Sequence, residues 1–259
     1  MTARFPEGTF TPRPGPGRPA RMLAVQATTE LKLALRNGEQ VLLTLLIPAM
    51  LLVGLTLLPL VPMPEPRVDA VTPGVLALAV MSTAFTGQAI ALGFDRRYGV
   101  ISRLAATALP RWLLVTGRLV AGIGVVVVQL VVLSVIAAVL GWEPAPAGLG
   151  WALLLVVLGV GAFGALGILL GGTVRAEITL ALANIVWFVL LLAGGIIVPL
   201  EQLPGPIAGV AAVLPSGALA EGLRTALTTG ASPGWQPVLV LLAWTAAATA
   251  AAARLVRWR

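Results

Sequence analysis

The chain has 259 residues, of which 58% are hydrophobic and 10% charged, and its mean hydropathy is +0.99. Charged residues make up about a quarter of a typical soluble protein, so this composition excludes an ordinary soluble domain. The chain contains no Cys and no His, which excludes disulfides, thiolate chemistry, and imidazole as a metal ligand, general base or proton relay. We therefore predict an all-α membrane protein with no metal site and no catalytic residues.

The N-terminal region divides into a tail and a helix. Residues 1–20 are rich in Pro, Gly and Arg, which predicts a disordered cytoplasmic tail. Residues 21–259 are expected to form one transmembrane domain. Within residues 22–37 most apolar side chains fall in one arc at helical spacing, with Glu30 and Arg36 outside it. This pattern predicts a helix lying in the membrane surface; a cytosolic juxtamembrane helix is the alternative.

Six apolar blocks follow, each long enough to cross the roughly 30 Å hydrocarbon core as a helix. They cover residues 41–61, 71–94, 119–141, 149–172, 178–198 and 236–253. Of the 17 basic residues, all but Arg67 and Arg224 fall before the first block, after the sixth, or in the second and fourth connections. The positive-inside rule then places both termini in the cytoplasm. Topology and anionic lipid explain the net charge of +7, so we expect no nucleic-acid partner.

The longest cytoplasmic connection, residues 95–118, combines Asp95, Arg96 and Arg97 with a segment that has an apolar helical face. A short helix there could present an apolar anchor and fixed charges, including Arg103, to a cytosolic partner. The alternative is that these charges only fix topology, with Asp95 as a solvated surface charge.

Residues 199–235 are too apolar for an ordinary external loop and are interrupted by prolines. We predict two short helices that dip into the outer leaflet; an amphipathic external cap is the alternative. Glu221 and Arg224 are three residues apart and hence neighbours on a helix. Their pairing is expected to be structural rather than a contact with substrate.

Few polar side chains interrupt the spans. Gln88, Gln129 and Asn184 are expected to form hydrogen bonds between helices, and Trp187 to pack; lining a translocation path is the alternative for all four. Gly167 and Gly171 have the spacing that permits close helix contact. The middle of each span lacks acidic residues, which argues against a cation-coupled carrier.

Two motifs give the chain a family resemblance. The connection after span two reads Asp95-Arg96-Arg97-Tyr98-Gly99 and then Arg103-Leu104, and it resembles the corresponding loop of the permease subunit of type 2 ATP-binding-cassette transporters. Val100 replaces the usual Thr, and Thr107-Ala108 replaces Thr-Pro. The second motif follows span five and matches the family in its order of Gly, Pro and charged residues: Gly195, Pro199, Pro204, Pro215, Glu221 and Arg224.

The resemblance, which is to the group that includes daunorubicin-type drug exporters, implies a division of labour. The chain lacks a Gly-x-x-x-x-Gly-Lys-[Ser/Thr] phosphate loop, so a separate ATPase subunit would bind ATP and Mg. It would dock on residues 95–111 and on the helix carrying Glu30 and Arg36. Two permease chains, identical or paralogous, would form a dimer in the bacterial cytoplasmic membrane.

Such a transporter would export an amphipathic or lipid-like substrate, as in multidrug export and antibiotic resistance. A membrane anchor or regulatory subunit without transport activity is the alternative.

Overall fold

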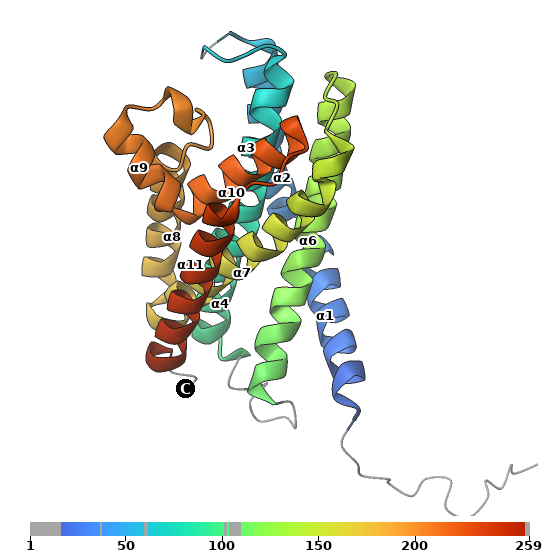
Figure 1. Cartoon of the computed structure of the whole chain (residues 1–259). Coiled ribbons are helices and arrows are strands. Elements are labelled where there is room, and N and C mark those ends of the chain that lie inside the picture. The colour runs from blue at the N-terminus through green and yellow to red at the C-terminus, as the bar shows by residue number, and fades with distance from the viewer. Residues whose placement is uncertain (1–16, 37, 60–61, 101–102, 104–109, 257–259) are drawn as a thin grey trace, which may run out of the picture.

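The computed structural model describes residues 17–36, 38–59, 62–100, 103 and 110–256. Throughout this described part the regular structure is helical, and most of the long helices lie side by side in one bundle (Figure 1). The first residues of α1 (Pro19–Arg36), the end of α4 (Gln88–Arg97), the start of α6 (Arg111–Val139) and the end of α11 (Trp235–Leu255) lie at the same end of the bundle (Figure 1). We call this the charged end, because Asp95, Arg118 and Arg254 lie in the last or first turns of these helices.

The first two helices of the chain pack against α6. Helix α1 covers Pro19–Arg36, α2 covers Gly38–Leu57, and α6 covers Arg111–Val139. A side chain on Gly117 would meet the Cγ atom of Gln26 at 2.7 Å, and one on Gly124 would meet Leu31 at 3.0 Å. Glycines in α6 thus let α1 approach closely. Its apolar face packs on a neighbouring helix, whereas the sequence had predicted that this face floats in the membrane surface.

The second span is one continuous helical rod with a change of winding in its middle. It consists of α3 (Arg67–Met81), a π-helical segment η1 (Ser82–Gly87) and α4 (Gln88–Arg97). The segment from Val71 to Met81 is buried throughout. This rod therefore forms the centre of the bundle, and its end positions the charged residues of α4.

Helix α7 (Leu149–Thr173), preceded by the 3₁₀ turn η2 (Pro146–Gly148), crosses this rod at very short distance. A Cβ atom on Gly167 would lie 2.8 Å from the carbonyl oxygen of Phe85, and one on Gly171 would lie 2.4 Å from that of Ala89. No side chain fits at either position, so the prediction of close packing from the Gly167–Gly171 spacing is confirmed.

The segment predicted to be an external hairpin contains two short helices, as expected, and they differ in burial. Helix α8 (Ala176–Ala193) leads through the turn η3 (Leu200–Gln202) to α9 (Gly205–Val213). Helix α10 (Pro215–Arg224) continues into the π turn η4 (Thr225–Thr229), at 96° to α9. Most of α10 is buried against α3, α7 and α11 (Trp235–Leu255), whereas α9 is mostly exposed.

Five helical rods of the described chain are long and apolar enough to cross a membrane, and a sixth is reached if the bent α9–α10 pair counts as one span. The five are Arg67–Arg97, Thr116–Val139, Pro146–Thr173, Ala176–Ala193 and Trp235–Leu255. The described apolar part of α2, Thr44–Leu57, is shorter than these. The prediction of six spans therefore holds for five blocks, and block one ends at Leu57 instead of residue 61.

The membrane-spanning part of α6 begins at Thr116, close to the predicted 119. The helix itself begins earlier, at Arg111, directly after Pro110, which is its N-cap residue. The connection after span two is accordingly shorter than the sequence suggested. One other predicted boundary is wrong. Helix α8 ends at Ala193 rather than 198, because Gly195 adopts a φ of +64° that a continuing helix does not allow.

Candidate functional site at the charged end of helix α4

Three consecutive charged residues at the end of α4 contact three different helices. Successive residues of an α-helix point about 100° apart, so Asp95, Arg96 and Arg97 leave the helix in different directions. They reach α6, the end of α7 and the start of α8, respectively. The end of the central rod is thereby joined to all three neighbours.

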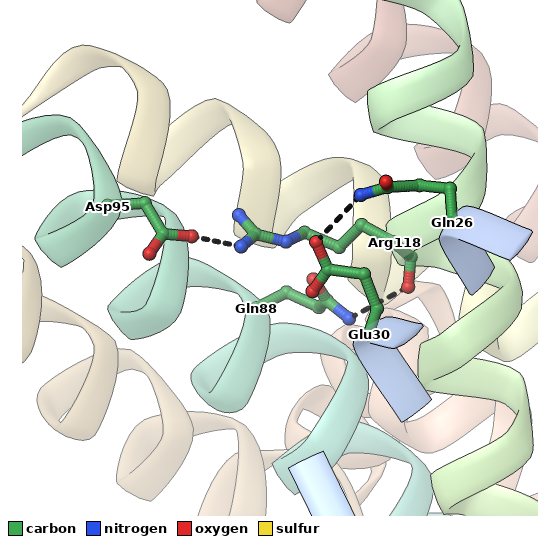
Figure 2. Close-up of polar contacts among 5 residues, drawn as sticks. All are labelled: Gln26, Glu30, Gln88, Asp95 and Arg118. Carbon is green, nitrogen blue, oxygen red and sulfur yellow. Dashed lines mark hydrogen bonds and ion pairs between the residues drawn. The ribbon is translucent and has the colours of Figure 1, made fainter. Parts of the chain in front are cut away.

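Asp95 forms an ion pair with Arg118 of α6 (Figure 2). The two side chains are 28% and 18% exposed, respectively, so the pair is partly shielded from water. Gln88, two turns earlier on α4, donates from Nε2 to the carbonyl oxygen of Arg118 at 3.5 Å. The same turn of α6 is therefore held by a charged contact and a polar one.

Arg96 caps the C-terminal end of α7. Its Nη1 donates to the carbonyl oxygens of Gly171 at 2.9 Å and Val174 at 3.2 Å. The last carbonyls of a helix have no partner within it and carry partial negative charge, so a guanidinium is well suited to this position. Arg97 forms an ion pair with Glu177 in the first turn of α8. The two side chains are 50% and 59% exposed, respectively.

Beyond α4 the chain turns at Gly99, whose φ of +68° favours glycine. Arg103 is exposed, and its Nη2 lies 3.5 Å from the carbonyl oxygen of Tyr98. Leu104 and most of the predicted docking helix lie outside the described residues. Of the predicted docking set, Arg103 thus presents its charge outward, while Asp95, Arg96 and Arg97 contact other parts of the chain.

Glu30 and Arg36 of α1 have different surroundings. Glu30 is half-buried and accepts a hydrogen bond from Nε2 of Gln26 at 3.1 Å (Figure 2). Gln26 touches α6 at Gly117, next to Arg118. Arg36, by contrast, is exposed in the last turn of α1. The two residues therefore do not form one patch.

Two hydrogen bonds link the π-helical segment to other helices. The Thr83 hydroxyl donates to Oε1 of Gln129 at 2.6 Å, and Nε1 of Trp187 donates to the Ser82 hydroxyl at 2.8 Å. Gln129 is only 3% exposed, and its Nε2 lies 3.4 Å from the carbonyl oxygen of Thr44 in α2. For Gln129 and Trp187 the structure favours bonding between helices over lining a path.

The four polar or aromatic residues suggested for a translocation path are not brought together. Asn184 is exposed on α8 and donates to the carbonyl oxygen of Leu180 within its own helix. Gln88 contacts Arg118 near the charged end, whereas Gln129 and Trp187 contact the π-helical segment.

In the predicted hairpin the three prolines precede or begin helical segments. Pro199 and Pro204 are the N-cap residues of η3 and α9, and Pro215 is the first residue of α10, a position where a missing N–H costs nothing. Nη1 of Arg224 lies 2.6 Å from Oε2 of Glu221, and the two side chains are 12% and 28% exposed. The pairing expected from their spacing is present in a largely buried helix.

Sequence reasoning did not identify the partners of these residues. These partners are Arg118, Glu177, Ser82 and Thr83. None of them lies in a recognisable sequence motif. Arg118 had been counted only as a topology charge; its position directly before the third apolar block was the available signal. The described residues hold no group of three or more acidic side chains arranged to bind a metal ion.

Comparison with known proteins places the chain in a family. The family model described as "ABC-2 type transporter" matches residues 23–228. The chain is also similar to a candidate transport permease, YvfS, from Bacillus subtilis (strain 168). The two are 25% identical over 227 residues, which cover 86% of this chain and 92% of that protein.

Proposed function

The chain belongs to the ABC-2 type transporter membrane family, and we propose that it is the transmembrane subunit of an ATP-driven exporter in the daunorubicin-type group. A separate ATPase subunit, binding ATP and Mg, would dock on residues 95–111. Two permease chains would complete the transporter in a bacterial cytoplasmic membrane.

The observation that carries this proposal is the arrangement at the end of α4. Asp95, Arg96 and Arg97 join this end to α6, α7 and α8, and Arg103 lies just beyond it with an exposed side chain. A partner that binds at Arg103 would therefore act on a helix end that is fixed to three others. Docking and coupling are thus assigned to different residues of the same motif.

The substrate class follows from the membrane region. Away from their ends, the described spans have few polar side chains, which are uncharged and mostly paired with protein groups. Such a region offers no charged groups for a hydrophilic solute, so an amphipathic or lipid-like substrate fits best. A membrane anchor without transport activity would need no bonded connection from the docking loop to three spans, which favours the transporter.

The test is purification of the tagged full-length chain from native membranes in mild detergent, followed by measurement of ATP hydrolysis. We expect an ATPase subunit to copurify with wild type and with Arg175→Glu, and to be lost with Arg103→Glu. Arg175 is a suitable control because it is also exposed at the charged end but lies outside the proposed docking loop.

Two results would contradict the proposal. If wild type yields no ATP hydrolysis under conditions that preserve its helical fold, the anchor hypothesis is preferred. If Arg103→Glu retains the ATPase as well as Arg175→Glu does, the docking site is not on this loop.

A further inference from the structure

Helix α1 carries a basic stripe on the face opposite α6. At 3.6 residues per turn, Arg18, Arg21, Lys32 and Arg36 fall within an arc of about 60°, on the side away from the buried Ala27. The backbone N–H of Met22 donates to the carbonyl oxygen of Arg18 at 3.1 Å, which extends the helical geometry back to Arg18. At 1.5 Å per residue the stripe is about 27 Å long.

The stripe is available to a partner. All four basic side chains are exposed, and none has an ion-pair partner among the residues that the structure describes. Exposed apolar side chains accompany them: Val25 lies within the arc, and Leu33 and Leu35 flank it on either side. Exposed apolar side chains beside basic ones suit a surface in contact with lipid, where the stems are apolar and the charged ends reach the headgroups.

The position of the stripe relative to the membrane-spanning part of α6 indicates whether a protein or lipid binds to it. Gln26 lies opposite Gly117, and Leu31 lies opposite Gly124, whereas the apolar span of α6 begins at Thr116. The first half of α1 therefore precedes the membrane-spanning part of α6, and the second half runs beside its first turns. A cytosolic protein would reach only the first half. Lipid headgroups at the boundary can reach Arg18 and Arg21, and the long side chains of Lys32 and Arg36 extend back along the helix towards the same headgroups.

We propose that this stripe binds the headgroups of anionic phospholipids. Basic side chains at the edge of the hydrocarbon region extend towards the interface, where phosphate groups neutralise them. The cytoplasmic leaflet has a negative surface potential that attracts such clusters. Lipid thus contacts the basic face of α1, while its apolar face contacts α6.

The test measures lipid retained by the purified full-length chain without any ATPase present. The protein is incubated in micelles with equal amounts of phosphatidylglycerol and phosphatidylcholine, separated by gel filtration, and its bound lipids are quantified by mass spectrometry. We expect Arg21→Gln/Lys32→Gln to lose phosphatidylglycerol by about fivefold or more, because removing even one basic residue from an anionic surface weakens binding by that factor. Arg175→Gln/Arg254→Gln removes the same charge from the same end of the bundle and should retain it.

Salt provides a second measurement that needs no variant. Raising ionic strength from about 0.1 to 1 M shortens the Debye length from roughly 10 to 3 Å, so phosphatidylglycerol retention by wild type should fall while phosphatidylcholine retention stays constant. The proposal is overturned if wild type shows no preference for phosphatidylglycerol or if its retention is independent of salt. Equal retention by the two double variants would also overturn it, and would leave the stripe to a protein partner.

Discussion

Neutralising Asp95 or Arg118 tests whether their ion pair holds α4 to α6. Exposed pairs contribute about 0.2–1 kcal/mol, and loss of one partner of a fully buried pair costs about 3–5 kcal/mol. Because these side chains are 28% and 18% exposed, we expect Asp95→Asn or Arg118→Gln to cost about 1–3 kcal/mol. For a chain of this size that corresponds to a fall in Tm of roughly 3–9 °C.

The assay is thermal unfolding in detergent, followed by the fluorescence of the seven native Trp residues, at one fixed scan rate. The double variant should lose less than the sum of the two single variants, since both remove the same contact. Arg97→Gln is the internal control: its pair with Glu177 is about half exposed, so its loss should stay below about 1 kcal/mol. Additive single effects, or a loss for Asp95→Asn no larger than for Arg97→Gln, would refute the reasoning.

Two further predictions use the same unfolding measurement. Gly171→Ala should lower the free energy of unfolding by about 1–3 kcal/mol, because the new Cβ would lie 2.4 Å from the carbonyl oxygen of Ala89. Gly150→Ala, where a Cβ would have nothing within 4 Å, should be neutral or stabilising. Equal effects of the two substitutions would contradict the close packing at Gly171. Gln129→Leu should cost about 1–2 kcal/mol by leaving the buried Thr83 hydroxyl without its partner. An unchanged Tm would show that this hydroxyl finds another acceptor.

The membrane architecture could be predicted from composition, because a span needs a continuous apolar block and the bilayer imposes its length. The hairpin could be predicted because proline is disfavoured in a helix interior and well suited to a helix start, which is where Pro204 and Pro215 lie. The predicted ends of helices were inaccurate where a single residue determines where the helix starts or stops. Pro110 placed the start of α6 eight residues before the apolar block, and Gly195 ended α8 early.

The contacts of the site could be predicted only in part. Helical spacing predicts the contact between Glu221 and Arg224, because both residues are on one short helix. It cannot give Asp95–Arg118 or Trp187–Ser82, which join helices far apart in the sequence and depend on how those helices pack. The π-helical segment has no recognisable signal in Ser82–Gly87, and we have no physical account of why the winding changes there.

The positions of these contacts along the second span determine what a docked partner can move. Below the π-helical segment, α4 is bonded to α6, α7 and α8 through its last three charged residues. At the segment itself, the side chains of Ser82 and Thr83 are bonded to α8 and α6. Force applied at the end of α4 therefore reaches three spans at once instead of bending one helix. In the proposed function, a partner bound at Arg103 would act on a helix end whose contacts pass the displacement on to these spans.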